Sequence, residues 1–429
     1  MKCSYHPGYH VSLPPGHPFP ISKYPLLKDR LLAEGVLSNG DLLEPEPLDR
    51  ETLQLVHTSE YLNKLESSGL SAGEQRKLGL PWSDSLWMRS RLASGGTLLA
   101  ARAAEETGRP AILTEHGIYT NERRIELLMA EWVADTVDKG HALDDPRFDL
   151  RDMWVRAFEA YARTCYEACA EVVTLYQDNQ RVQKVLGADP GKLRVIANGI
   201  DLARFSAITP APESGIPVIA LIGRVVPIKD VKTYIRAAKH LAARLPALKA
   251  YVIGPTDEDE VYAEECRQLV RDQGLEAIVE FTGAVDIVQY MSRIHVVVLT
   301  SLSESQPLVV LEAGASGIPF VATDVGSCRE ILEGRPDEQP PLGKGGIVTD
   351  VVDDKGIADA VYSLLRDPAL RRRYGETLRS RVRATYTSAQ AVEAYRDLYA
   401  RHLRDELWMV NAEAQVRPRA VSVAVREED

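Results

Sequence analysis

Three absences limit what this chain of 429 residues can be. Its five cysteines are few and scattered, so we do not expect a disulfide framework. The net charge is −11 and no dense block of Lys or Arg occurs, which argues against a nucleic-acid partner. No apolar run is long enough to cross a bilayer, and residues 1–16 lack the pattern of a signal peptide. We therefore expect a cytoplasmic protein, and docking to a membrane complex stays open.

The second half of the chain alternates short apolar segments with longer amphipathic ones. Strands are predicted at 217–221, 248–253, 279–281, 296–299 and 320–323, with a helix in each interval. This alternation indicates a doubly wound α/β domain with a parallel sheet. With 45% hydrophobic residues, the chain has enough apolar material for two or three such cores.

The stretch SESQPLVVLEAGASGIPFVATDVG, residues 303–326, carries the strongest candidate site. Glu304 and Glu312 are eight positions apart, so a loop and the first half of a helix can direct both carboxylates at one ligand. The free N–H groups at the helix start suit an anion, but Pro307 has none, so Leu308 or Val309 must donate. Carboxylates can accept hydrogen bonds from sugar hydroxyls, and the nearby amides can donate to a phosphate. Together these groups suggest that the ligand is a nucleotide-sugar. The alternative is a surface helix with two solvated acids.

A second candidate segment, GRVVPIKDVK, follows the predicted strand at 217–221. Gly223 permits close backbone approach, and Arg224 and Lys229 flank the turn into the next helix. An arginine fork and a lysine point charge together suit a diphosphate, which would make a metal unnecessary. The alternative is a pair of ordinary surface charges. The acidic segment 254–265 lacks the Gly and Glu positions of an EF-hand, so we interpret it as a solvated loop.

Residues of about 106–404 resemble the PelF-like glycosyltransferases of the family-four retaining class. LTEHGIYTNERRIEL, residues 113–127, and the Gln306–Pro307 pair carry the resemblance, although most of the class has Gly-Phe-Gly after the first Glu of the pair. The resemblance implies a GT-B fold with two Rossmann-like domains and a UDP-sugar donor. By this resemblance, Arg224 and Lys229 would bind the diphosphate of the donor.

The same resemblance gives roles to three further residues. Glu304 would contact the hydroxyls of the donor sugar, and Glu312 would hold the ribose. His116 would reach the donor sugar from the other domain, although a lone histidine at a strand end is more often structural.

Residues 1–105 resemble a different family, the histone-deacetylase-like hydrolases. YHPGYH, PEPLDRETLQLVHTSEYL and RSRLASGGTLLAARAA carry this resemblance. A zinc hydrolase needs three metal ligands and a base around an activated water. The His-His dipeptide and the Asp-x-His pair of that family are missing from the chain, so we expect no metal site. A zinc-dependent deacetylase is therefore the least favoured function.

These resemblances divide the chain into five parts. We expect a deacetylase-like fragment at 1–105, the remainder of the acceptor-side Rossmann-like domain at 106–205, and the nucleotide-sugar domain at 206–387. A crossover helix at 388–404 and a tail at 405–429 complete the chain. Helices are predicted at 24–34, 49–65, 86–106 and 149–170. The first domain is composite, and the sequence leaves its completeness open.

The predicted function is transfer of a sugar, glucose by resemblance, from a UDP-sugar to a polysaccharide acceptor in Pel-type exopolysaccharide synthesis. The alternative is a catalytically dead UDP-sugar-binding module, since the Gly-rich acceptor loop of the family is absent from residues 1–105. We expect no cofactor and no nucleic acid. The sequence leaves open whether the protein docks to an inner-membrane polysaccharide-synthesis complex. The sequence does not reveal the acceptor, the oligomeric state or the origin of the fusion.

Overall fold

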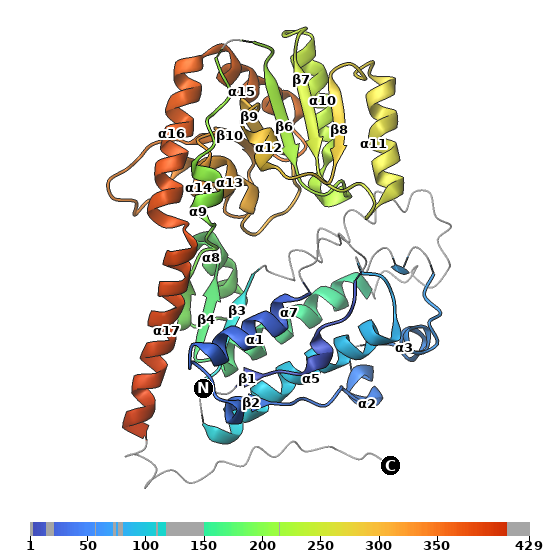
Figure 1. The fold of residues 1–429 in the computed structure, drawn as a ribbon, viewed down its shortest axis with the longest axis vertical. Helices are drawn as coiled ribbons and strands as arrows, with labels where there is room; N and C mark the ends of the chain where they lie inside the picture. The colour runs from blue at the N-terminus through green and yellow to red at the C-terminus, as the bar shows by residue number, and fades with distance from the viewer. Residues whose placement is uncertain are drawn as a thin grey trace.

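The computed structural model describes residues 3–13, 21–55, 57–71, 74–75, 80–108, 110–116, 150–213 and 215–409. Within these residues the chain forms two parallel-sheet domains, one above the other in Figure 1, with the long α16 and α17 along one side. This is the α/β architecture that the sequence predicts. Among the described residues, no helix combines the length and apolar character that crossing a membrane requires.

The first domain begins with a short parallel pair and a group of helices. The pair is β1 (Cys3–Ser4) with β2 (Leu42–Leu43). The helices are α1 (Lys23–Ala33), α2 (Arg50–Gln54), α3 (Ser59–Glu66) and α5 (Asp84–Thr107). The prediction of one helix over 49–65 is wrong, because Asp49 caps the start of one helix and Thr58 caps the start of a second. Asp49 accepts from the Thr52 amide at 2.7 Å, and Thr58 accepts from the Tyr61 amide at 3.2 Å.

A three-stranded parallel sheet follows, in the order β3-β4-β5. Its strands are β3 (Ile112–Glu115), β4 (Glu171–Thr174) and β5 (Leu193–Val195). The helices here are α7 (Leu150–Ala168) and α8 (Gln177–Val185), whereas α9 (Leu202–Ser206) packs through Phe205 into a core of the second domain. Leu398 of α17 (Ser388–Met409) packs against Val173 and Ile196, so the last helix covers this sheet. Helix α17 also extends beyond residue 404, where the sequence analysis places its end.

The second domain holds a six-stranded parallel sheet in the order β11-β10-β9-β6-β7-β8. Its strands are β6 (Val218–Ile222), β7 (Lys249–Ile253), β8 (Val279–Gly283), β9 (Val296–Leu299), β10 (Phe320–Thr323) and β11 (Gly346–Thr349). Five of the six follow the predicted positions. The strand order reverses between β6 and β9, which is the topological switch point of a doubly wound sheet.

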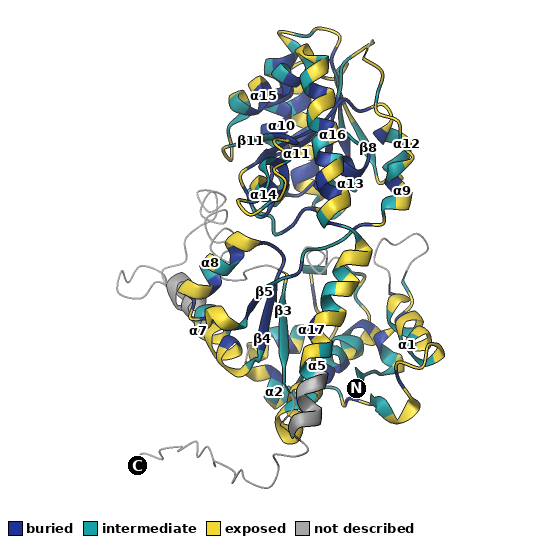
Figure 2. Cartoon of the chain, turned by 90° about the vertical axis from the view of Figure 1, so that its left-hand side faces the viewer, coloured by how far each residue is buried: buried dark blue, intermediate teal, exposed yellow. Residues whose placement is uncertain are grey.

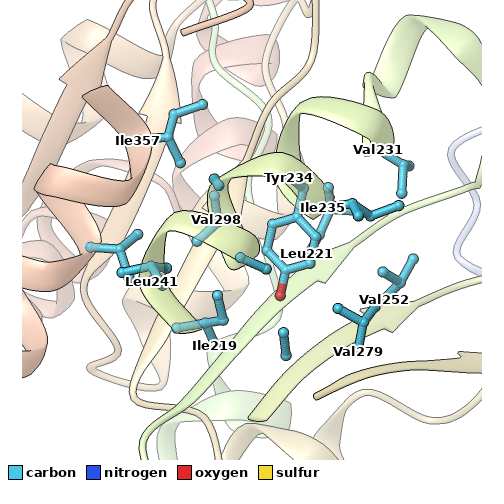
Figure 3. Close-up of a cluster of buried hydrophobic side chains, with 14 of the residues drawn as sticks. Ile219, Leu221, Val231, Tyr234, Ile235, Leu241, Val252, Val279, Val298 and Ile357 are labelled. Atoms are coloured by element: carbon cyan, nitrogen blue, oxygen red, sulfur yellow. The ribbon is translucent and has the colours of Figure 1, made fainter. Parts of the chain in front are cut away.

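Helices cover both faces of this sheet. They are α10 (Val231–Ala242), α11 (Glu260–Asp272), α12 (Val288–Met291), α13 (Leu308–Ala315), α14 (Cys328–Glu333), α15 (Asp354–Arg366) and α16 (Pro368–Thr385). Figure 2 shows buried strands beneath helices whose outer faces are exposed. One core contains Leu221, Val298 and the fully buried Tyr234, whose hydroxyl donates to the Tyr251 carbonyl at 3.1 Å (Figure 3). A second core packs on the same sheet. Together the two cores fix the ends of the strands that carry the loops of the candidate site.

Candidate functional site

The candidate site lies where the loops after β6 and β9 meet, at the switch point of the second sheet. Ligands of open α/β sheets bind in the crevice outside the carboxyl ends of the strands at this point. Hydrogen bonds join the two loops: Thr300 Oγ1 donates to the Lys229 and Asp230 carbonyls at 2.9 Å, and the Leu302 amide donates to the Ile228 carbonyl at 2.9 Å. Their relative position is therefore set by the protein itself.

The loop after β7 packs closely against the same turn. The Gly223 amide donates to the Ile253 carbonyl at 2.9 Å. The next residue, Gly254, has φ +149, and a Cβ at this position would come within 2.0 Å of the Gly223 carbonyl oxygen. Glycine at position 254 thus lets the loops after β6 and β7 approach this closely.

Lys229 and Glu304 form an ion pair at the centre of the site. Lys229 Nζ donates to Glu304 Oε1, and Ser301 Oγ donates to the same oxygen at 2.6 Å. The Lys229 side chain is 21% exposed and that of Glu304 13%, so the pair is partly shielded but open to a ligand. The structure thus brings together two residues that are 75 positions apart in the sequence.

Arg224 lies on the same loop as Lys229, but its partner is a different carboxylate. It pairs with Glu258, on the acidic loop that leads into α11. The side chains are 53% and 32% exposed, so solvent weakens this pair. Both candidate diphosphate cations are therefore neutralised by carboxylates in the structure. An incoming anion must compete with Glu304 and Glu258.

The start of α13 offers donors next to this pair. Pro307 is its N-cap and no side chain caps the helix, so the first amides, those of Leu308 and Val309, point out of the helix end. Glu312 lies in the second turn, and burial raises the pKa of its carboxyl above the usual value. Gly326, with φ +54, lies against this loop, and a Cβ there would come within 2.2 Å of the Ser305 carbonyl oxygen.

Contacts from the first domain reach the edge of the site. The Asn198 amide, just after β5, donates to Gln306 Oε1 at 2.6 Å. The Gln177 amide, at the start of α8 after β4, donates to Glu330 Oε2 at 3.0 Å. The carboxyl ends of β4 and β5 therefore face the second domain, as Figure 1 shows.

His116 lies directly after β3 and is exposed. The described contacts do not join it to Glu304 or Lys229, and residues 117–149, which include the rest of the quoted motif, lie outside the described part of the chain. The neighbouring Glu115 accepts from the Tyr166 hydroxyl at 2.9 Å and from Gln183 Nε2 at 2.7 Å, which gives it a structural role.

Three polar residues around the site were not predicted from the sequence. Ser301, Glu258 and Asn198 belong to no motif, and their roles depend on which loops meet across the sheet. Gln306 was noted as part of the Gln-Pro variant, but its contact with the first domain was not expected. Within the described residues, no group of three or more His, Cys, Asp or Glu side chains is arranged to hold a metal ion.

Three family models match parts of the chain. Residues 216–367 match "Glycosyl transferases group 1". Residues 17–117 match "Histone deacetylase domain", and residues 92–191 match a domain of unknown function, DUF3492. The last two matches overlap near the junction that the sequence analysis places at about residue 105.

Curated relatives cover part of the chain. A D-inositol 3-phosphate glycosyltransferase 2 of Catenulispora acidiphila is 30% identical over 281 residues, 61% of each chain. The glycogen synthase of Mycobacterium tuberculosis is 27% identical over 231 residues, 53% of each chain. The chain thus spans between about half and three-fifths of the length of these relatives.

Solved structures are similar over more of the chain. Anabaena HepE in complex with UDP and glucose has a TM-score of 0.56 at 16% identity, over 87% of this chain and 89% of its own. A glycosyltransferase from Rickettsia africae has a TM-score of 0.52 at 14% identity, over 88% of each chain. Identities this low establish the fold alone. Residues 216–367 thus match the group 1 glycosyl transferases, and the chain has the GT-B fold of two facing parallel-sheet domains.

Proposed function

We propose that the protein is a retaining glycosyltransferase that transfers a sugar, glucose by resemblance, from a UDP-sugar to a polysaccharide acceptor. The observation that carries this proposal is the Lys229–Glu304 pair at the switch point, beside Arg224 and the uncapped start of α13. The group 1 family match and the GT-B fold agree with it. HepE, which shares the fold, was solved with UDP-glucose.

In the proposed mechanism, this chain stabilises charge on the leaving diphosphate. Arg224, Lys229 and the amides of Leu308 and Val309 would face the diphosphate as the bond to the sugar breaks, while Glu304 and Glu312 would hold sugar and ribose hydroxyls. Electrostatic stabilisation of this kind is usually the largest catalytic contribution. Two side-chain cations would take the place of a metal ion, so activity should persist in EDTA.

The domain assignment is part of the proposal. Residues 206–387 would bind the donor, residues 106–205 would present the acceptor side, and closure of the two would bring His116 to the donor sugar. We place the reaction in the cytoplasm, in Pel-type polysaccharide synthesis, with docking to an inner-membrane complex. These finer assignments rest on sequence resemblance.

Calorimetric titration of UDP and UDP-glucose tests the site first. Binding should be lost in Glu312→Ala and kept in Glu276→Ala, a control that removes an exposed carboxylate remote from the site. Failure of UDP to bind well-folded protein would remove the proposal.

Turnover then tests the mechanism. Arg224→Ala should cost about 2–4 kcal/mol of transition-state stabilisation, seen as a fall in kcat/KM when UDP release is measured in the presence of acceptor. An unchanged rate in Arg224→Ala, or activity abolished by EDTA, would contradict the assigned roles.

A second function is favoured by one observation. The first-domain sheet has three strands in the described residues, and residues 17–117, which include β3, match a histone deacetylase domain instead of a transferase. A binding module that holds UDP-sugar without transferring it would explain this. UDP binding without turnover on any glycan would favour that function.

A further inference from the structure

A pocket of about 330 Å³ lies at the end of the second sheet opposite the candidate site. It is formed by residues of α16 between Arg371 and Arg379, by residues that precede β9 and β10, and by the segment 210–213 that leads into β6. These residues lie at the amino ends of the strands, whereas the loops of Arg224 and Glu304 lie at the carboxyl ends. The pocket is therefore separate from the proposed donor site.

Two arginines of α16 line this pocket and, among the described residues, form no hydrogen bond to a carboxylate. Arg371 is 7% exposed, and its hydrogen bond in this part of the chain is a long one of 3.5 Å to the Leu365 carbonyl. Arg379 donates from Nη2 to the Ser316 carbonyl at 2.6 Å, while its Nε is buried without a partner there. Burial lowers the pKa of both guanidinium groups. Glu213 acts on the charge of Arg371 and Glu376 on that of Arg379, but only from a distance. A buried charge without a counter-charge in direct contact costs folding free energy.

The backbone holds these arginines on one side of the helix. They are eight residues apart, about two turns, with Gly375 between them. A Cβ on Gly375 would come within 2.1 Å of the Gly317 carbonyl oxygen, and one on Gly317 within 2.2 Å of Arg379 Nη2. The two glycines let α16 approach the turn before β10, and this contact fixes the Arg379 guanidinium at the pocket wall.

The other titratable groups leave an excess of positive charge. Arg372 pairs with Glu213, and Glu376 is the second carboxylate of the lining. His295 is neutral in this arrangement, because Nδ1 accepts from the Val218 amide at 3.1 Å and Nε2 donates to the Pro212 carbonyl at 2.9 Å. Three guanidinium groups thus face two carboxylates, one of which is already paired.

We propose that this pocket binds a phosphate dianion, either inorganic phosphate or a phosphate monoester, between Arg371 and Arg379. Guanidinium groups match the oxygens of phosphate in a forked geometry, and the anion supplies a counter-charge in direct contact with both arginines. The volume accommodates a monoester with a small organic group. This proposal stands independently of the proposed transferase activity.

Thermal unfolding of the full chain in potassium phosphate, against potassium chloride of equal ionic strength, tests the proposal. Phosphate should raise the unfolding midpoint in the wild type and in Arg373→Gln, a control on the exposed side of the same helix. Arg379→Gln should weaken the apparent affinity for phosphate about tenfold or more, since a charge-assisted contact is lost. Equal midpoints in phosphate and chloride for the wild type would overturn the proposal.

Two further variants test whether the phosphate effect arises at the donor site or from a folding defect instead of at this pocket. Arg224→Gln should keep the phosphate effect, because Arg224 lies at the other end of the sheet. Glu213→Gln should increase phosphate affinity, because it frees Arg372 while leaving Arg371 and Arg379 in place. Loss of the effect in Arg224→Gln, or no gain in Glu213→Gln, would place the anion elsewhere.

Titration with glycerol 3-phosphate distinguishes the two sources of the anion. Tighter binding of glycerol 3-phosphate than of inorganic phosphate, lost in Arg379→Gln, would assign the pocket to a monoester. Tighter binding of inorganic phosphate, with the same loss, would assign it to the free ion. A response to either that Arg379→Gln leaves unchanged would contradict the proposal.

Discussion

Glu312 shows how a residue proposed for binding can oppose stability. Burial raises the pKa of its carboxyl above 4.5, so the folded protein holds this proton more readily than the unfolded chain. As pH rises through the folded pKa, ionisation therefore removes stability. The same desolvated carboxylate is a strong acceptor for hydroxyl groups of a ligand, which would offset the penalty only in the bound state.

We predict that Glu312→Gln raises the unfolding midpoint at pH 7 while it weakens UDP binding. The gain in midpoint should shrink as the pH falls toward 4.5, since Glu312 is then protonated in the folded wild type. Thermal unfolding followed by circular dichroism across this pH range measures it. Glu276→Gln, an exposed counterpart, should show no such pH-dependent gain, and a midpoint lowered at pH 7 in Glu312→Gln would refute the argument.

Arg224 and Glu258 form a pair that a diphosphate would have to break. We predict that Glu258→Gln tightens UDP binding several-fold at most, since exposed ion pairs contribute less than about 1 kcal/mol. The gain should diminish at high salt, because salt already screens the wild-type pair. Calorimetry at two ionic strengths provides the measurement. Weaker UDP binding in Glu258→Gln would mean that Glu258 orients Arg224 instead of competing for it.

At the level of elements, the sequence predicted what a strong local pattern determines. The strands at 296–299 and 320–323 were placed correctly because short runs of buried apolar residues lie between turn residues. The predicted helix over 49–65 failed because Thr58 competes locally as an N-cap. Strand β11 was missed, since its four residues follow a Pro- and Gly-rich loop and pair with β10 only in the folded sheet.

The residues of the candidate site also differ in whether a local sequence pattern identifies them. Arg224, Lys229, Glu304 and Glu312 could be selected from the sequence, because each lies in a motif of recognisable chemistry. Their partners Ser301 and Glu258 could not be selected. A hydrogen bond between residues from separate strand ends depends on the order of strands in the sheet, which the linear pattern does not contain.

Arg381 joins three elements of the second domain through one buried side chain. It is 2% exposed and bonds Glu338 through Nε at 2.6 Å and Nη2 at 2.9 Å. It also donates to the Ile331 carbonyl at 3.0 Å and the Gly343 carbonyl at 2.6 Å. The end of α14 and the loop before β11 are therefore held to α16 by this residue.

We predict that Arg381→Met lowers the free energy of unfolding by about 3–5 kcal/mol, because it leaves Glu338 partly buried without its partner. Arg383→Met, on the exposed side of the same helix, should change it by about 0.5 kcal/mol or less. Urea unfolding measures both. The double variant Arg381→Met/Glu338→Gln should recover part of the loss, and a loss in Arg381→Met no larger than in Arg383→Met would contradict the buried-pair argument.

At the scale of the molecule, the two domains have separate cores and limited contact. The cores of the second domain are built mainly on its own sheet, while α17 completes the core of the first. Between them lie the Asn198–Gln306 and Gln177–Glu330 hydrogen bonds and a bridge between Ile200 and Thr387. This organisation favours independent unfolding of the two domains.

The tryptophans make this independence measurable. All five, Trp82, Trp87, Trp132, Trp154 and Trp408, lie outside the segment 155–407. Tryptophan fluorescence therefore reports on the first domain and the end of α17, whereas circular dichroism reports on both domains. The two signals should give different unfolding midpoints if the domains unfold separately.

We predict that UDP at about 100 times its dissociation constant raises the midpoint of the second domain alone. Saturation at this level stabilises the binding domain by about 2.7 kcal/mol, or about 5–10 °C for a domain of this size. The shift should occur in the circular dichroism transition and not in the tryptophan transition. Glu312→Ala should abolish it. An equal shift of both signals would show instead that UDP holds the two domains together as one cooperative unit, with the first domain contributing to the nucleotide site.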